Sequence, residues 1–279
     1  MAVVGNLLLV TLIAGVVGTG VGGLVGALLQ KESNRVVSLL LSFAAGVMLS
    51  VVCFDLVVEA IETNTGIYMV IFAIALGVFA TYFLNYIIDK KTNPELAHID
   101  ASHPETADDL DELIHSDHLE HHVLKNDNKF SLFIAGIVMA CAIALHNVPE
   151  GMTIGASYAM EDAVFGSSSL ILAILIGLHN IPEGMAVSVP LISGGMKKYR
   201  AVLITAATGI PTILGALLGF WLGEIGPLGL TLSLGFASGA MLYVVFGEIL
   251  PQSILMYHSK APAFSAIIGM LVGLLIIFA

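Results

Sequence analysis

The sequence predicts an all-α membrane protein with eight transmembrane helices, and three observations lead to that prediction. Of the 279 residues, 57% are hydrophobic and only 11% are charged, whereas a soluble domain carries about 25% charged residues. The charges are crowded into residues 90–129, and long stretches elsewhere have none. Eight apolar runs are long enough to cross a hydrocarbon core of about 30 Å, because each helical residue rises about 1.5 Å. Backbone groups at that depth bond only to each other, and runs this continuous are typical of helices rather than of a closed barrel. The runs cover roughly 3–29, 36–61, 67–88, 130–159, 164–192, 199–223, 227–250 and 261–279.

The first run is interpreted as an uncleaved first span. No Lys or Arg precedes Lys31, and the first run is longer than the apolar part of a secretory signal, so we expect no cleaved signal peptide. Cys53 lies in the second run and Cys141 in the fourth. We expect both cysteines to be buried small apolar residues rather than a disulfide or a metal-binding pair.

The stretch between the third and fourth runs, residues 90–129, differs from the rest of the chain. It holds six of the nine histidines and ten of the 21 acids, with few apolar residues. This composition predicts a disordered loop. Four of its histidines lie within eight residues, close enough together to chelate a metal; weak metal buffering or sensing and a simple solvated spacer are both open interpretations. These four are His115, His118, His121 and His122.

The fourth and fifth runs carry the same seven-residue motif with one conservative difference. The fourth reads His-Asn-Val-Pro-Glu-Gly-Met from His146, and the fifth reads His-Asn-Ile-Pro-Glu-Gly-Met from His179. In each copy the Glu follows the His by four positions and therefore shares its helix face. Each His comes near the middle of its run, so the two motifs lie at similar depth on antiparallel helices and are expected to face each other.

The chemistry of this duplicated motif is that of a metal site. Two imidazoles and two carboxylates suit a borderline divalent cation, Zn²⁺ first and also Fe²⁺, Mn²⁺, Co²⁺ or Cd²⁺. Two ionised glutamates would balance the cation, which matters where unpaired charge is costly. Without a cation the carboxylates would repel each other, so we expect the empty site to retain a proton that metal binding displaces. Polar contacts between helices would explain one such His better than they explain a duplicate. The candidate ligands are His146, Glu150, His179 and Glu183.

Each copy of the motif also contains a proline, Pro149 or Pro182. A proline inside a helix removes one hydrogen bond to the residue four positions earlier, which frees the carbonyls of Leu145 and Leu178. Each freed carbonyl lies next to a candidate histidine, where it can bind an ion, a water molecule or the neighbouring Asn.

The last three runs contain an internal repeat of the first three. Residues 43–55 and 236–248 share seven of thirteen residues at an offset of 193, which is 236 minus 43. Corresponding runs have opposite parity, so the two copies would cross the membrane in opposite directions. The sequence therefore predicts inverted repeats of spans 1–3 and 6–8, with the site at their interface. Chance similarity among small apolar residues is the alternative. The same offset pairs Thr19, Gly22, Leu24 and Gly26 with Thr212, Gly215, Leu217 and Gly219.

The distribution of Lys and Arg predicts the orientation. All ten basic residues fall in alternate connections, beginning with the one between the first and second runs, and the other connections contain acids alone. Cytoplasmic connections collect Lys and Arg. We therefore expect a multi-pass protein of the cell membrane with both termini outside and the histidine-rich loop in the cytoplasm.

Three further acids lie at membrane depth, Asp55 and Glu59 in the second run and Glu248 in the seventh. We expect all three towards the outer ends of their spans, where they would form an acidic entrance that attracts cations. Interfacial carboxylates that only face water are the alternative.

At the duplicated motif the sequence resembles the ZIP family (zinc- and iron-regulated transporter-like) of divalent metal transporters. The resemblance covers residues 1–279 as one transmembrane domain. It implies eight spans in a 3+2+3 arrangement, a homodimer in the lipid bilayer, and transport towards the cytoplasm by an alternating-access carrier whose site-bearing helix bundle slides past a static one. It also implies that the two His and two Glu of the motifs are the principal ligands. Asn147 and Asn180 would belong to an adjacent second site that shares the glutamates.

The sequence departs from this family at one position of the second site. Bacterial members place a Glu in the sixth span that completes that site, whereas here Thr212 stands in its place. With only two carboxylates, the centre is expected to hold one ion tightly and a second only weakly, because uncompensated charge is costly at this depth.

Two other functions are possible for such a chain. An intramembrane metal-dependent hydrolase would show His-Glu-x-x-His on one helix; this chain has His-x-x-x-Glu twice and no nucleophilic Ser or Cys beside it, so no enzyme is expected. A passive metal channel is the second alternative, although ligation by four side chains favours a carrier. No organic cofactor is expected, and ten basic residues spread over four short sites make no patch for nucleic acid.

Overall fold

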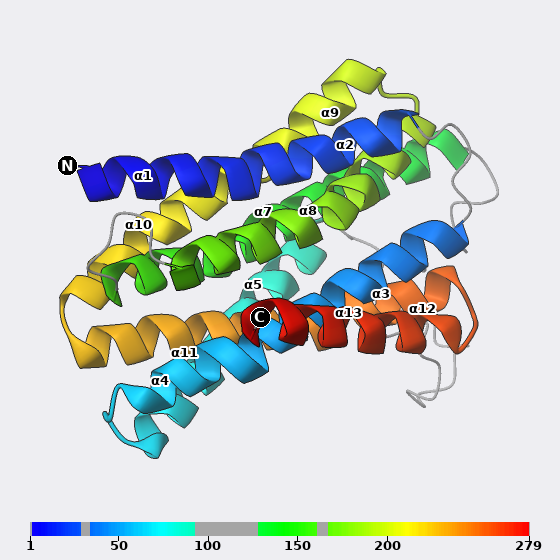
Figure 1. The fold of residues 1–279 in the computed structure, drawn as a ribbon. Helices are drawn as coiled ribbons and strands as arrows, with labels where there is room; N and C mark the ends of the chain where they lie inside the picture. Colours follow the sequence, from blue (N-terminus) through cyan, green and yellow to red (C-terminus); the bar gives the residue numbers. More distant parts are fainter. Residues whose placement is uncertain (1, 29–33, 93–127, 161–166, 279) are drawn as a thin grey trace.

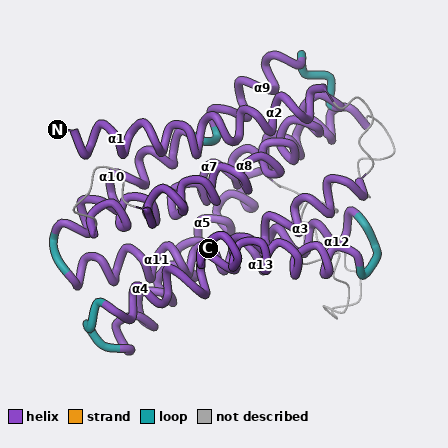
Figure 2. The backbone as a smooth tube through the Cα atoms, viewed as in Figure 1, coloured by secondary structure: helices purple, strands orange, loops and turns teal. Residues whose placement is uncertain are grey.

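The structure, a computed structural model, describes residues 2–28, 34–92, 128–160 and 167–278. Every regular element in this part of the chain is a helix (Figures 1 and 2). Eight of its helical stretches are long and apolar enough to cross a membrane, which confirms the predicted all-α fold with eight spans. These spans are Val3–Leu28, Arg35–Glu62, Ile67–Ile87, Gly136–Met160, Ser169–Ser193, Lys198–Glu224, Pro227–Met256 and Ala261–Phe278.

Four of the spans are interrupted, and the other four are single helices. Span one is α1 (Ala2–Thr11), the π-helical turn η1 (Leu12–Val17) and α2 (Gly18–Leu28). Span two is α3 (Asn34–Val51), η2 (Val52–Leu56) and α4 (Val57–Glu62). Span six is α9 (Lys198–Ala207) and α10 (Ile210–Glu224), and span seven is α11 (Pro227–Val244), η4 (Val245–Ile249) and α12 (Leu250–Met256). The single helices are α5 (Ile67–Thr92), α7 (Asn128–Met160), α8 (Ser167–Ser193) and α13 (Ala261–Phe278).

The interruptions correspond between the two predicted repeats. The π-helical turns of spans two and seven begin at Val52 and Val245, which are again 193 residues apart (245 minus 52), and each turn is five residues long. Single π-helical turns inside α-helices are rare, so their coincidence at the same offset favours the repeat. The repeat and the 3+2+3 arrangement stay predictions.

The helices associate in two layers (Figure 1). In the upper half of Figure 1, α2 and α9 pack on α8, α10 packs on α7, and α7 packs on α8. In the lower half, α3 packs on α13 and α12, and α11 packs on α5. The layers meet where α11 contacts α7 and where α3 contacts α8. Spans one and six thus pack with the motif-bearing helices, whereas spans two, three, seven and eight form the second layer.

Glycines bring paired helices into backbone contact. A Cβ atom on Gly151 of α7 would overlap the carbonyl oxygen of Thr212, and one on Gly215 of α10 would overlap the carbonyl oxygen of Val148. This contact is reciprocal, as is typical of membrane helices that associate through small residues. It fixes α10 directly against the turn of α7 that carries the motif.

The two cysteines and the predicted loop 90–129 are the remaining features expected from the sequence. Cys53 and Cys141 were expected to be buried, but both are exposed. The expectation was wrong because the exterior of a membrane-spanning helix is itself apolar, so a small apolar side chain is as stable facing lipid as facing the interior. The predicted loop 90–129 lies mostly outside the described residues, since α5 ends at Thr92 and α7 begins at Asn128.

Candidate metal centre

The two copies of the motif lie on α7 and α8, and the helices continue through both prolines. Pro149 is inside α7 and Pro182 is inside α8. The two helices contact each other. The candidate ligands are almost completely buried: the exposed fraction is 3% for His146, 2% for His179, and no more than 1% for either glutamate. Ionisable side chains buried this deeply need partners, and here the partners are one another.

Each histidine faces the glutamate of the other helix. The Nε2 atom of His179 lies 2.8 Å from Oε1 of Glu150, which is a hydrogen bond. The Nε2 atom of His146 lies 3.4 Å from Oε2 of Glu183, within ion-pair distance but without hydrogen-bond geometry. The two motifs therefore face each other at one depth, as their positions in the sequence predicted.

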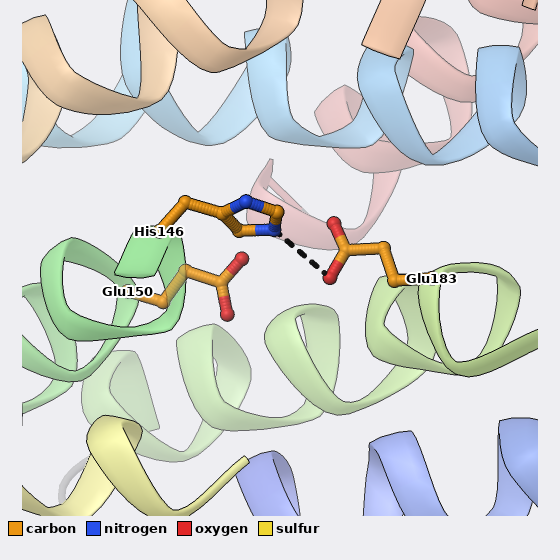
Figure 3. Close-up of side chains that lie close together, drawn as sticks. All are labelled: His146, Glu150 and Glu183. Atoms are coloured by element: carbon orange, nitrogen blue, oxygen red, sulfur yellow. Dashed lines mark ion pairs between the residues drawn. The ribbon is translucent and has the colours of Figure 1, made fainter. Parts of the chain in front are cut away.

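Three of the four side chains converge closely enough to share one cation. One ligand atom from each of His146, Glu150 and Glu183 lies within 4.8 Å of the others (Figure 3). In the close-up these side chains point into one space from two antiparallel helices. His179 stands beside this group through its contact with Glu150. Among the described residues, Oε2 of Glu150 and both oxygens of Glu183 accept no hydrogen bond, and Oε2 of Glu183 is held only by its ion-pair contact with His146.

The two asparagines are held by the interrupted spans. Nδ2 of Asn147 donates to the carbonyl of Thr208, 2.6 Å away, at the break between α9 and α10. Nδ2 of Asn180 donates to the carbonyl of Ala14, 3.0 Å away, in the π-helical turn of span one. Both Oδ1 atoms are buried, and neither has a hydrogen-bond partner in the part of the chain that the structure describes. The irregular turns thus orient two neutral oxygens that a cation can use.

Thr212 is fully buried on α10 and closely approaches Gly15 of η1. Its Oγ1 atom has no hydrogen-bond partner within the described ranges. It lies four positions after Thr208, which holds Asn147. The position therefore offers one neutral oxygen near the asparagines and no charge.

The three further acids do not form one entrance. Span two runs antiparallel to span seven: Oγ of Ser38 donates to the carbonyl of Ser253, 2.6 Å away, and the Oγ1 atoms of Thr63 and Thr231 are 2.6 Å apart at the other end. Glu248 comes just before Ser253, whereas Asp55 and Glu59 come just before Thr63. Glu248 therefore lies in the opposite half of the bundle from the other two acids.

The expectation of a shared entrance was wrong because spans two and seven run in opposite directions. Asp55 and Glu248 both lie in the C-terminal halves of their spans, and in antiparallel spans these halves lie at opposite ends of the bundle. Glu248 instead accepts a hydrogen bond of 2.6 Å from Nδ2 of Asn85 on α5. Asn85, His146 and Glu248 line one cavity of about 120 Å³. Asn85 was missed in the sequence, where its only signal was an amide side chain inside an apolar run.

The loop histidines His115, His118, His121 and His122 lie outside the described residues. Their predicted metal binding therefore stays a prediction.

Comparisons with known proteins agree with these observations. A family model described as "ZIP Zinc transporter" matches residues 5–279. The chain is 32% identical over 252 residues to the zinc transporter ZupT of Chlorobium chlorochromatii, covering 87% of this chain and 85% of that protein. It is 31% identical to the zinc transporter ZupT of Campylobacter jejuni (96% and 93% covered) and 30% identical to the zinc transporter ZIPB of Bordetella bronchiseptica (93% and 75% covered).

Proposed function

The chain belongs to the ZIP zinc transporter family, and we propose that it carries a divalent metal ion, Zn²⁺ first, across the membrane towards the cytoplasm. Fe²⁺, Mn²⁺, Co²⁺ and Cd²⁺ are further candidates, because imidazole and carboxylate ligands suit all of them. Members of this family are transporters rather than enzymes, so the hydrolase alternative is set aside. The observation that carries the proposal is the convergence of His146, Glu150 and Glu183 within 4.8 Å at membrane depth.

The metal would be bound by both helices at once. His146 and Glu150 come from α7 and Glu183 comes from α8, and His179 can join when its contact with Glu150 opens. Two ionised glutamates cancel the charge of one divalent ion, so the loaded centre is neutral where net charge is expensive. Asn147, Asn180 and Thr212 would add neutral oxygens next to it, which can position an ion or water but cannot balance a second charge.

The pairing of His179 with Glu150 supports an exchange of proton for metal. A nitrogen and a carboxylate oxygen 2.8 Å apart share a hydrogen between them. Zn²⁺ binds the lone pair of a histidine nitrogen, so a cation bound to Nε2 and Oε1 must replace that hydrogen. Because net charge is costly at this depth, we expect the empty His/Glu pair to retain one proton beyond those of a neutral imidazole and a carboxylate. Metal binding from one side would displace that proton, and protonation would favour release on the other side.

A path through the membrane can be proposed from the remaining acids. Asp55 and Glu59 would attract the cation at one end of the bundle, and Glu248 would receive it at the other. The cavity that joins His146 to Glu248 supports the second step. The lysines and arginines of the alternate connections support an orientation with the Glu248 end in the cytoplasm and with both termini and the Asp55 end outside.

The two layers support alternating access. The layer with α7 and α8 would carry the ion past the layer with α3, α5, α11 and α13, which would hold the protein as a homodimer in the cell membrane. The burial of all four ligand side chains supports a carrier rather than an open channel. The histidine-rich loop would bind metal weakly at the cytoplasmic face.

The test is uptake of Zn²⁺, Mn²⁺ and Cd²⁺ by proteoliposomes under defined pH and voltage gradients. A carrier predicts uptake that saturates with metal concentration and changes with the pH gradient at constant voltage. Empty liposomes and liposomes with the Glu150→Gln/Glu183→Gln protein serve as controls. Non-saturating conduction, or uptake equal to that of the controls, would contradict the proposal.

A further inference from the structure

An apolar groove of about 320 Å³ lies between span one and α8. It is bordered by two ridges of exposed side chains, and within each ridge the residues are four positions apart, which places them on one helix face. One ridge is Ile13, Val17 and Val21, and the other is Leu170, Ile174 and Leu178.

The floor of the groove is recessed because it is made of small residues. Ala14 is 3% exposed and Ala173 is 5% exposed. Gly177 also lines the groove, and a Cβ atom on it would lie 3.5 Å from Cα of Ala14, an ordinary contact, so a methyl group fits there without moving the backbone. Further along, a Cβ atom on Gly22 would overlap the carbonyl of Ile181. The helices are therefore in backbone contact there, and this contact closes the groove at that end.

The length of the groove matches one leaflet of a bilayer. On α8 it runs from Leu170, at the start of the span Ser169–Ser193, to Ile181 at its middle. The 11 steps between these residues (181 minus 170) correspond to about 16 Å, and half of a hydrocarbon core of about 30 Å is about 15 Å. We propose that the groove binds one acyl chain of a membrane lipid, from the leaflet at the N-terminal end of α8.

The chemistry of the groove fits this occupant. Its lining residues are aliphatic or glycine, and an apolar cavity of this kind does not hold water. An acyl chain gains no hydrophobic free energy when it moves from the surrounding lipid into the groove, because both are apolar. Its retention in the groove therefore depends on close packing against protein atoms. An acyl chain in the groove has protein atoms on three sides, the two ridges and the floor. An acyl chain on the outer face of a single helix has protein atoms on one side. Because dispersion contacts add up, the groove holds the acyl chain more strongly.

The groove also borders the candidate metal centre. Its floor includes Ala14, whose carbonyl holds the amide of Asn180, and its ridge includes Leu178, the residue before His179. A bound acyl chain would pack against the π-helical turn that orients Asn180. The proposal stands on the shape and depth of the groove alone and does not require that the protein transports metal.

The experiment uses the full chain in liposomes that contain a trace of phosphatidylcholine with a photoactivatable diazirine in the middle of one acyl chain. After irradiation, labelled residues are mapped by mass spectrometry and normalised to exposed surface. The reference surface is α13, where Leu271 is 59% and Leu275 69% exposed. We expect severalfold more label on the ridges of the groove than on α13.

Two variants test whether the groove itself is responsible. Gly177→Leu fills the floor and should reduce labelling of the ridges to the level of α13. Gly5→Leu makes the same change on α1 at a position where no described atom lies within 4 Å of the added Cβ, and it should leave the labelling unchanged. If Gly177→Leu does not fold, Gly177→Ala, which the 3.5 Å contact tolerates, should give a smaller reduction.

Three outcomes would overturn the proposal. The first is equal labelling of the ridges and of α13 in the unchanged protein. The second is undiminished labelling of the ridges in folded Gly177→Leu and Gly177→Ala proteins. The third is less label on the ridges than on α13, which would mean that a second copy of the chain covers the groove.

Discussion

At the scale of single residues, the candidate centre depends on contacts between helices rather than within them. The His and Glu of one motif share a helix face, yet each His faces the Glu of the other copy. Neither helix alone therefore carries a complete ligand set. This arrangement makes the centre sensitive to the relative position of α7 and α8.

We expect Thr212 to limit the centre to one tightly bound ion, and Thr212→Glu should create or tighten a second site. The added carboxylate would supply the charge that Asn147 and Asn180 lack, because neutral oxygens cannot balance a second divalent ion at this depth. Elemental analysis of protein from which residues 100–124 are deleted should give about one metal per chain at micromolar zinc before the substitution, and more after it.

Thr212→Gln is the matched control, since it has the size of Glu without the charge and should leave the stoichiometry at one. Two fully occupied intramembrane ions per unmutated chain would refute the argument from charge.

At the scale of helices, backbone contacts through glycine hold the motif in place. Gly151 and Gly215 bring α7 and α10 together immediately beside Pro149 and Glu150. The added side chain in Gly215→Leu would meet the backbone of Val148, which cannot move aside as a flexible side chain can. Overpacking of this kind costs about 1–3 kcal/mol or more.

Gly215→Leu should therefore lower the midpoint of thermal unfolding in detergent and reduce zinc binding together with it. Gly5→Leu, with open space around its Cβ atom, should change neither. An unchanged unfolding midpoint for Gly215→Leu would show that α7 and α10 are not packed as described.

Much of the arrangement of the helices could be predicted from the sequence. Hydropathy predicted the eight spans, because the membrane imposes a minimum length on every crossing. The duplicated motif predicted that α7 and α8 face each other. The position of Glu248 was predicted wrongly. Span seven runs antiparallel to span two, so its C-terminal half, which contains Glu248, lies at the opposite end of the bundle from Asp55. Asn85 could not be identified at all, since its role depends on the packing of α5 against α11, which no local pattern in the sequence encodes.

At the scale of the whole molecule, we expect transport not to require the histidine-rich loop. The candidate ligands, the cavity to Glu248 and both helix layers all lie within the described spans. Deletion of residues 100–124 should therefore leave zinc uptake by proteoliposomes largely intact, while the number of weakly bound zinc ions per chain falls.

A scrambled loop of the same composition, which keeps the histidines and the charge, should retain the weak binding. Loss of uptake by a deletion protein that is correctly assembled would show that the loop is part of the pathway.

The central claim is that the buried His/Glu centre between α7 and α8 carries the transported ion, and zinc uptake by single variants tests it most directly. His179→Ala and Glu183→Ala should each reduce initial uptake by more than about tenfold, because loss of one ligand costs more than about 1.4 kcal/mol of binding. Leu178→Ala, beside His179 but 52% exposed on the outer surface of α8, should transport normally. Near-normal uptake by either ligand variant, at matched amounts of folded protein, would contradict the account.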